Sequence, residues 1–483
     1  MNERESKRAA LLIATLSSLL TPFMGSSVNL ALPSIAKEFG INAVVLSWVA
    51  TSYLLAAAVS LVPFGRLADI YGRKRVFTQG VILFTISSFL SAMATSGFML
   101  IVCRVFQGIG SAMIFATGIA ILTSVFPPHE RGKAIGINIA AVYIGLSLGP
   151  FLGGLLTQHC TWRSVFLVTI PLGLLIIAVV RWRLPGEWAE AGGEAFDIPG
   201  TIFYGLSLVA IMAGLSLLPA MMSLVLILCG VISFLVFVVW EMHTAHPVLN
   251  LALFMSNRVF AFSNLAALIN YSATFAVTFL LSLYLQHIKA LSPQNAGLIM
   301  VAQPLVQAAF SPLAGSLSDR IEPRIVASAG MFITTIGLGC FTMLAEATTV
   351  LFIVGSLVVL GFGLALFASP NTNAIIGSVE RKYYGLASGS VGTMRLVGMM
   401  ISMGIATLVF AVLIGRVPIT VEVYPSLIKG TRVAFTIFVI LCLGGIAASS
   451  VRGRLRAHNN SNTTAPSAAS IRESTGIHEK EGR

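Results

Sequence analysis

Long apolar runs, broken by short charged or turn-forming interruptions, follow one another along the whole chain. About twenty predominantly apolar residues suffice to cross a bilayer as a helix, so each run predicts one membrane span. The pattern predicts about fourteen spans, at roughly 9–32, 44–64, 76–95, 98–122, 135–157, 164–182, 199–218, 221–241, 259–284, 295–314, 325–345, 348–369, 385–414 and 432–450. The first run is too long for a signal-peptide core and is predicted to be a permanent span. The short gap at Pro219 leaves open that the seventh and eighth spans form a re-entrant hairpin.

The composition agrees with a membrane-embedded chain. Hydrophobic residues make up 56% of the 483 residues and charged residues only 10%, whereas a soluble domain carries roughly a quarter charged residues. The sequence contains no HExxH, GxxxxGKS/T or GxSxG motif, and its five cysteines show no metal-ligand spacing. We therefore expect no enzyme activity, no cofactor and no metal site.

Basic residues are distributed unevenly between the two sides of the predicted bundle. The side that carries both termini holds Arg66, Arg73, Lys74, Arg75, Arg131, Lys133, Arg181, Arg183, Arg258, Arg320, Arg324, Arg381 and Lys382, and the tails add Arg4, Lys7, Arg8, Arg452, Arg454 and Arg456. The opposite side holds only Lys37, Arg163, Lys289, Arg416, Lys429 and Arg432. By the positive-inside rule, both termini are predicted to be cytoplasmic in a multi-pass protein of the cell membrane. The net charge of +12 is then a matter of topology, and no nucleic-acid partner is expected.

An internal repeat divides the chain into two halves. GRLADIYGRKR, starting at Gly65, is echoed by GSLSDRIEPR, starting at Gly315, so that Asp69 is matched by Asp319. Each copy lies between the second and third spans of a six-span block, as in transporters built from parallel repeats. We predict an all-α fold with a cytoplasmic tail at 1–8, a six-helix bundle at 9–183, a linker with two extra helices at 184–242, a second, pseudo-symmetric six-helix bundle at 243–451 and a disordered cytoplasmic tail at 452–483.

Four spaced motifs resemble those of the major facilitator superfamily. Its signature loop GxLaDrxGrkr is matched by Gly65, Leu67, Asp69, Gly72, Arg73, Lys74 and Arg75, and its RxxQGxG motif resembles the segment with Arg104, Gln107, Gly108 and Gly110. The GxxxGPxxGG motif of its exporters resembles the segment with Gly145, Gly149, Pro150, Gly153 and Gly154. The first span of its fourteen-helix drug:proton antiporters ends in VNVALP, which is similar to VNLALP at 28–33. The resemblance covers nearly the whole chain and implies a secondary transporter that works by alternating access.

The signature loop, residues 65–75, is expected to be a cytoplasmic loop that latches the two halves together. Its glycines allow a tight reversal and close helix approach, and Asp69 can accept hydrogen bonds from Arg73 or face the positive end of a neighbouring helix. The resemblance implies that the latch comprises Gly65, Asp69, Gly72, Arg73 and, in the second copy, Asp319. The alternative is that Arg73, Lys74 and Arg75 only set the topology.

Polar side chains inside the spans mark a candidate cavity for substrate binding or coupling. Arg104 is costly in mid-span unless it faces protein or water, and Gln107 shares its helix face. The further candidates are Arg395, Gln303, Gln307 and Asn270. The alternative for Arg104 is a structural side chain bonded to carbonyl groups of a neighbouring helix. For the Gln and Asn residues, the alternative is hydrogen bonding between helices.

The fifth span carries a regular glycine pattern. Gly145, Gly149 and Gly153 recur every four residues and give one smooth face for close helix packing, while Pro150 adds a bend. Together with Gly154, these residues are expected to form a hinge that also seals the transport path. A purely structural packing seam is the alternative.

No carboxylate is predicted at the depth where a cationic substrate would need one. Many fourteen-helix antiporters have an acidic residue where this chain has Met24, and every Asp and Glu falls in a tail, a loop or a span end. A lipophilic cation in a desolvated cavity requires a carboxylate, so a neutral or anionic substrate is favoured. The candidates for a coupling proton are Asp69, a span-end carboxylate such as Glu241 or Glu346, and the substrate itself.

The function expected is export of small amphipathic, drug-like or metabolite molecules, and the resemblance implies multidrug efflux with protons as the counter-substrate of an antiporter. The expected partners are the small-molecule substrate, protons and the lipid bilayer, and the chain is expected to act as a monomer. An importer or symporter of an organic anion and a non-transporting membrane sensor are the alternatives.

Overall fold

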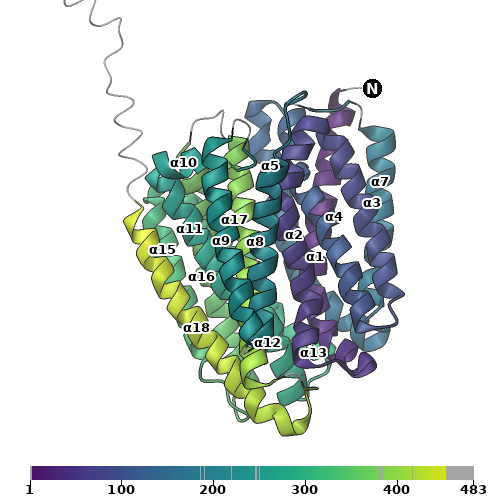
Figure 1. The fold of residues 1–483 in the computed structure, drawn as a ribbon, viewed down its shortest axis with the longest axis vertical. Helices are drawn as coiled ribbons and strands as arrows, with labels where there is room; N and C mark the ends of the chain where they lie inside the picture. The colour runs from purple at the N-terminus through teal and green to yellow at the C-terminus, as the bar shows by residue number, and fades with distance from the viewer. Residues whose placement is uncertain are drawn as a thin grey trace, which may run out of the picture.

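The computed structural model describes residues 3–184, 186–189, 191–218, 220–244, 247–249, 251–379, 384–415 and 417–452. Its long helices form one bundle, and both described ends of the chain lie at the same end of it (Figure 1). We call this the terminal end, and we call the opposite end, where α12 (Val277–Leu283) and α13 (Pro293–Met300) lie, the far end. The described chain has 14 helices long and apolar enough to cross a membrane, which confirms the predicted number of spans.

The spans follow the predicted order. The first six are α1 (Glu3–Phe39), α2 (Ala43–Tyr71), α3 (Arg73–Ala92), α4 (Gly97–Val125), α5 (Pro128–His159), and α6 (Ser164–Leu167) with α7 (Thr169–Arg183). The two central spans are α8 (Ile198–Leu217) and α9 (Met221–His243). After the short α10 (Leu251–Ser256), the last six are α11 (Arg258–Thr274) with α12 and the π-helical turn η1 (Tyr284–Ile288), α13 with α14 (Ala302–Arg320), α15 (Pro323–Phe341), α16 (Val350–Gly377), α17 (Tyr384–Leu413) and, after the 3-10 turn η3 (Val421–Val423), α18 (Tyr424–Val451).

The expectation that residues 65–75 form a loop is wrong. α2 continues through Tyr71 and α3 begins at Arg73, so only Gly72 lies between the two helices. Gly72 has a φ of 112°, which a residue with a Cβ atom rarely adopts. The apolar run ends earlier than the helix because backbone hydrogen bonding continues after the side chains become polar.

The central spans are two separate helices. α8 has 20 residues and α9 has 23, so each is long enough to cross the membrane. They pack side by side, with the Ser233 hydroxyl of α9 donating to the Phe203 carbonyl of α8 at 2.9 Å. This arrangement excludes the re-entrant hairpin.

Two spans of the second half are interrupted, which the hydropathy pattern did not indicate. The ninth span breaks between α11 and α12, where the Ala276 N–H donates to the Ser402 hydroxyl of α17 at 3.0 Å. The tenth span breaks between α13 and α14 at Val301. The side-chain acceptor at the first break satisfies a backbone group that the helix leaves unpaired.

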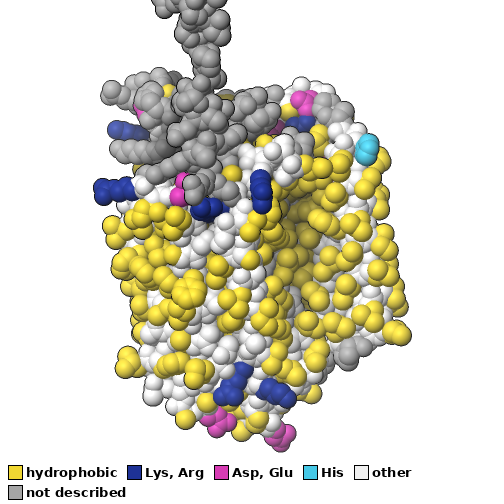
Figure 2. Space-filling view, turned by 90° about the vertical axis from the view of Figure 1, so that its left-hand side faces the viewer, with side chains coloured by type: hydrophobic (Ala, Val, Ile, Leu, Met, Phe, Trp, Pro, Cys, Tyr) yellow, Lys and Arg dark blue, Asp and Glu magenta, His cyan; other side chains and the backbone are white. Residues whose placement is uncertain are grey.

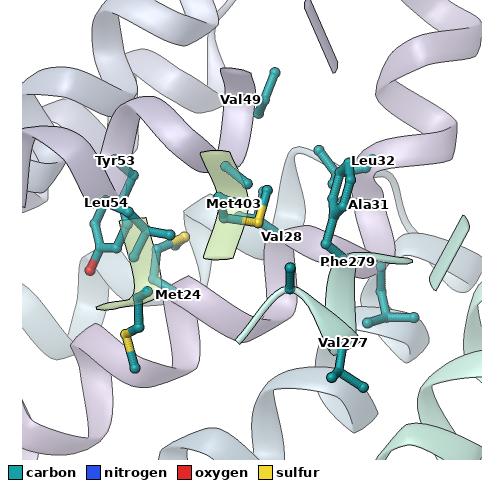
Figure 3. Close-up of a cluster of buried hydrophobic side chains, with 14 of the residues drawn as sticks. Met24, Val28, Ala31, Leu32, Val49, Tyr53, Leu54, Val277, Phe279 and Met403 are labelled. Carbon is teal, nitrogen blue, oxygen red and sulfur yellow. The ribbon is translucent and has the colours of Figure 1, made fainter. Parts of the chain in front are cut away.

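The largest buried apolar cluster extends across both halves. Figure 3 shows Val28 of α1 beside Met403 of α17, with Met24 of α1 on one side and Phe279 of α12 on the other, and all four are buried. Met24 is 0% exposed. The position where the resembling antiporters have an acid therefore lies in an apolar cluster that contains residues of both halves.

The outer surface has the polarity expected of a membrane protein. Figure 2 shows a belt of hydrophobic side chains between two ends that carry Lys, Arg, Asp and Glu. α9 lies largely outside the packed bundle, since large apolar side chains such as Leu228, Phe234 and Leu235 are exposed along it. Such a helix is stable only where lipid covers its apolar surface.

Candidate functional site

Asp69 and Arg73 form the charged centre of the signature loop, residues 65–75, which is helical except at Gly72. Arg73 Nε donates to Asp69 Oδ1 over 2.9 Å, and Arg73 Nη2 lies 2.8 Å from the same oxygen. Arg73 Nη1 also donates to the Ser124 hydroxyl of α4 over 2.8 Å. The predicted contact is present. In the described part of the chain, the hydrogen bonds of residues 65–75 go to the first six spans or to segment 184–194, so a latch to the second half remains a prediction.

The second copy of the repeat has the same helix–turn–helix form. Gly315 and Asp319 lie in the last turns of α14, as Gly65 and Asp69 lie in the last turns of α2. A Cβ on Gly315 would lie 3.0 Å from the Ser369 hydroxyl of α16, which explains the small residue. The side chain of Asp319 falls outside the described side chains, so its part in the latch stays a prediction.

Arg104 is bonded entirely within the first half in the contacts that the structure describes. Its Nε donates to the Val49 carbonyl of α2 at 3.0 Å, and Nη1 donates to Gln107 Oε1 at 2.6 Å. The guanidinium lies 4.2 Å from the centre of the Tyr53 ring, and Gln107 Nε2 donates to the Ser88 hydroxyl of α3 at 2.7 Å. With Arg104 1% exposed and Gln107 0% exposed, this geometry agrees with the structural alternative, and a cavity role for either residue stays a prediction.

Residues of both halves meet around Tyr143 of α5. Its side chain lies near Ser311 and Gln307 of α14 and near Tyr271 of α11 and Arg395 of α17. The guanidinium of Arg395 lies 5.5 Å from the centre of the Tyr271 ring, within the range of a cation–π contact. We call these five residues the polar cluster. Each lies well inside its span, so the polar cluster lies at mid-depth in the bundle.

The polar cluster includes two of the predicted candidates and approaches a third. Arg395 and Gln307 belong to it, and Gln303 Nε2 donates to Gln307 Oε1 at 3.3 Å. Tyr143 was missed because a tyrosine in an apolar span gives no polar signal in a hydropathy pattern. Its position seven residues before Pro150 of the exporter-like motif, on the same helix, was the available clue.

Asn270 is placed differently from the other candidates. It is 0% exposed, and neither its Oδ1 nor its Nδ2 has a partner among the described residues. A buried amide without partners is costly, so water or a ligand group is needed to satisfy it. This leaves Asn270 as a candidate contact, with no direct bond to the polar cluster.

The glycine motif of α5 packs against helices of both halves. A Cβ on Gly145, Gly149 or Gly153 would collide with Leu19, Ser26 or Ser27 of α1, respectively. On another face of α5, a Cβ on Gly154 would collide with the Pro293 carbonyl of α13, and a Cβ on Gly297 of α13 would collide with the Pro150 carbonyl. The motif thus combines a packing seam inside the first half with a contact between the halves.

The two halves are joined by hydrogen bonds near the far end. Outside the polar cluster, the described chain has five such bonds between the first six and the last six spans: Ser282 Oγ to the Asn29 carbonyl, 2.6 Å; Gln286 Nε2 to the Leu30 carbonyl, 3.2 Å; Ser47 Oγ with Thr407 Oγ1, 2.9 Å; His159 Nε2 with Gln294 Oε1, 2.9 Å; and Ala43 N to the Val417 carbonyl, 3.2 Å. All five lie in the far-end half of the bundle. The structure is therefore closed at the far end.

Arg452 is predicted from the sequence to belong to the tail, but it is buried. It is 1% exposed at the end of α18, where Nη1 donates to Asn371 Oδ1 at 2.7 Å and to the Ser263 hydroxyl at 3.3 Å. Burial lowers the pKa of Arg452 to about 10, so the guanidinium remains charged at neutral pH. A charged residue after an apolar run is typical of the start of a tail, so hydropathy gave no signal for this contact. The rest of the predicted disordered tail lies outside the described residues.

The central helices contain the two buried carboxylates of the described chain. Asp197 caps α8 by accepting from the Gly200 N–H at 3.0 Å, and it also accepts from Trp240 Nε1 at 3.0 Å. Glu241 accepts from the N–H groups of Val248 and Leu249 at 3.3 and 3.2 Å. Both carboxylates approach Gly200, so two acidic groups lie close together in a buried position. Of the two, only Glu241 is a coupling candidate from the sequence.

The fold and the site together define a class of protein. A bundle of 14 membrane-crossing helices, with a polar cluster between two six-span halves and a closed far end, is the construction of a membrane transporter. A model of the Major Facilitator Superfamily matches residues 14–262 and 263–476, and the chain belongs to that family. It is a multi-pass transporter and not an enzyme.

Curated relatives cover most of this chain. The riboflavin transporter RibZ of Clostridioides difficile (strain 630) is 34% identical over 81% of this chain and 85% of its own length. The cephamycin export protein CmcT of Amycolatopsis lactamdurans is 32% identical over 80% and 82%, and the multidrug resistance protein Stp of Mycobacterium tuberculosis (strain CDC 1551 / Oshkosh) is 31% identical over 83% and 75%. These names describe the relatives and range from a vitamin to antibiotics.

Solved structures share the fold at low sequence identity. A peptide transporter POT crystallised with sulfate matches with a TM-score of 0.70 at 12% identity, covering 94% of this chain and 99% of that chain. A D-xylose-proton symporter matches with a TM-score of 0.62 at 14% identity, covering 90% and 97%. The likeness extends to the architecture of the bundle and carries no information on the substrate.

Proposed function

We propose that the protein is a proton-coupled exporter of small amphipathic molecules that are neutral or anionic. The observation that carries this proposal is the polar cluster, which presents the cation Arg395 at mid-depth between the two halves. Two tyrosines, Tyr143 and Tyr271, lie beside it and offer ring faces and hydroxyl groups. An aromatic molecule with a carboxylate, phenolate or imide group matches these side chains, because it can stack on a ring and accept from a guanidinium.

The described chain has no carboxylate at mid-depth, and this supports a substrate that is neutral or anionic. Met24, at the position of the acid in resembling antiporters, is packed in the apolar cluster of Figure 3. The buried carboxylates Asp197 and Glu241 lie near the terminal end of the central helices instead. A cationic substrate at the polar cluster would face Arg395 without a counter-charge, which costs free energy in a site shielded from water.

The arrangement of contacts supports alternating access with a cytoplasmic terminal end. The inter-half hydrogen bonds close the far end, and the basic residues predict that the terminal end faces the cytoplasm. In the plasma membrane, a transporter closed toward the outside is in the state in which an exporter takes up its substrate. Opening the far end then requires separation of α5 from α13 and of α1 from α12.

The relatives support an amphipathic, ring-containing substrate. Two of their names contain riboflavin and cephamycin, which are both ring systems with polar substituents, and a third contains multidrug resistance. Riboflavin is a planar neutral molecule, so it is a suitable probe for the polar cluster.

The test is transport in inverted membrane vesicles with three aromatic probes of different charge. We expect riboflavin and fluorescein, which are neutral and anionic, to accumulate when the vesicle interior is acidified, whereas the cation ethidium is not taken up. Vesicles without the protein provide the control. Accumulation of ethidium alone, or uptake of the anion only in right-side-out vesicles, would contradict the proposal and favour a cation exporter or an anion importer, respectively.

A further inference from the structure

The segment that links α7 to α8 lies against the signature loop. The Arg73 N–H donates to the Trp188 carbonyl at 2.9 Å, and the Ala191 N–H donates to the Asp69 carbonyl at 2.9 Å. Lys74 Nζ donates to the Leu184 carbonyl, and Arg66 forms an ion pair with Glu194. We call the described residues of this segment, 184, 186–189 and 191–194, the clasp. It holds the loop through backbone groups on both sides of Gly72.

Glu187 makes the most specific contact of the clasp. Its Oε1 accepts from the Lys74 N–H at 2.8 Å, and its Oε2 accepts from the Arg75 N–H at 3.1 Å. These N–H groups belong to the first turn of α3, which has no side-chain cap of its own because its N-cap residue is Gly72. Glu187 therefore supplies from more than a hundred residues away the acceptor that Ser, Asp or Asn usually supplies locally.

Gly72 is needed for this contact as well as for the turn. A Cβ on Gly72 would lie 2.6 Å from Glu187 Cγ and Oε1, so a side chain there would displace the carboxylate. The carboxylate also lies where the helix dipole favours a negative charge, beside Arg73, Lys74 and Arg75. The glycine and the basic residues of the signature loop thus form a binding site for one anionic group, the carboxylate of Glu187.

The clasp connects the signature loop to the central helices. It continues directly into Asp197, whose carboxylate caps α8 and bonds to Trp240 of α9. In this far-end-closed state the loop is held by this route, and Arg73 also bonds to Asp69 and to Ser124 of the first half. If the signature loop moves against the second half, either its hydrogen bonds to the clasp break or the clasp moves with it.

We propose that Glu187 is a positioning residue of the transport cycle: by capping α3 it holds the signature loop in the far-end-closed state, and its release accompanies far-end opening. This inference rests on the proposed alternating access, but it requires neither a particular substrate nor proton coupling.

The experiment measures far-end opening without a substrate. The five native cysteines are replaced by alanine, and Ser282→Cys is introduced on α12, where the residue is 0% exposed and contacts the Asn29 carbonyl. In purified protein in liposomes, the initial rate of maleimide labelling at this position reports the population that is open at the far end, provided that closing is faster than labelling.

Three substitutions of Glu187 separate charge from structure. We expect Glu187→Gln to raise the labelling rate about two- to fivefold, as removal of one charge from a helix N-terminus predicts. Glu187→Lys should raise it further, and Glu187→Asp should restore a rate near that of the parent. Glu5→Gln, which removes an exposed acid from the same end, is the matched control and should leave the rate unchanged.

The outcomes distinguish positioning from stability and from the proposed function. Thermal unfolding midpoints are recorded for each variant, because a merely structural Glu187 would lower the midpoint without changing the labelling rate well below it. Parent-like labelling in both Glu187→Gln and Glu187→Lys overturns the inference. If the cysteine introduced by Ser282→Cys is never labelled in any variant, including the parent, alternating access itself is contradicted.

Discussion

Arg395 is the charged side chain that the polar cluster offers to a substrate, so its charge is expected to select among ligands. Arg395→Gln should weaken fluorescein binding by about tenfold or more, since a hydrogen bond to a charged group contributes about 1.5–3 kcal/mol. Riboflavin, which is neutral, should be affected less. Arg395→Lys, which keeps the charge, is the control, and binding is measured by fluorescence quenching of the purified protein. Equal losses for the two probes would show that Arg395 does not discriminate by charge.

Arg104 is expected to contribute to folding rather than to substrate affinity. Arg104→Lys keeps a positive charge but cannot reproduce the planar fork that reaches both Val49 and Gln107. Leaving one buried acceptor unpaired costs about 1–3 kcal/mol, so the thermal midpoint should fall while the folded fraction binds riboflavin normally. If Arg104→Lys kept the thermal unfolding midpoint of the parent but lost riboflavin binding, Arg104 would be a substrate-binding residue.

At the scale of one element, α5 provides two adjacent glycines with different neighbours. A Cβ on Gly153 would lie 2.7 Å from the Ser27 carbonyl oxygen within the first half, whereas a Cβ on Gly154 would approach Pro293 and lie 3.1 Å from Gln294 Cα in the second half. Gly153→Ala should therefore lower stability, by about 1–3 kcal/mol for an overpacked contact.

Gly154→Ala should instead keep the first half intact and disfavour closure of the far end. The expected result is faster maleimide labelling of Ser282→Cys with little change in the thermal midpoint. Gly153→Ala is the matched control for the added methyl group. If both variants lost stability equally and labelled alike, α5 would be a packing seam and not a hinge.

The central pair of helices is expected to contribute to proton coupling through Glu241. Its carboxylate is buried beside Asp197, and two neighbouring acids in a buried position favour the protonated form of one of them. Glu241→Gln should abolish accumulation driven by a pH gradient but retain counterflow of riboflavin. Glu422→Gln, at an exposed far-end turn, serves as the control. Retained gradient-driven accumulation in Glu241→Gln would exclude this residue and leave Asp69, Glu346 or the substrate as the proton carrier.

For the whole molecule, the distribution of basic residues predicts that the terminal end is cytoplasmic. In intact cells, a membrane-impermeant maleimide should label Thr95→Cys at the far end and should not label Arg75→Cys at the terminal end. Both positions are exposed, and Thr95 avoids Ser96, whose hydroxyl caps α4. Permeabilised cells, in which both positions should react, provide the control. Labelling of Arg75→Cys alone in intact cells would reverse the orientation.

Local patterns of the sequence were sufficient for the number of spans, their order and the family. Apolar run length alone separates membrane helices, because the bilayer imposes one minimum length on all of them. The motifs at 65–75, 104–110 and 145–154 are short enough to read without knowing the fold. The absence of an acid at Met24 is likewise visible in the sequence, since it concerns the identity of a single residue.

Contacts between distant segments were decided only by the tertiary structure. The sequence is the same whether Arg104 lines a cavity or holds helices together. Only the packing of α2 and α3 against α4 shows that its described bonds stay within the first half. Tyr143 and Arg395 are 252 positions apart in the numbering and meet because α5 and α17 line the same interface. No sequence pattern indicated the role of Glu187, because a capping residue from another segment has no fixed distance in sequence from the helix that it caps. The length of an apolar run and the identity of a residue are local features that can be read from the sequence. Which side chains contact one another depends on how the fourteen helices pack together.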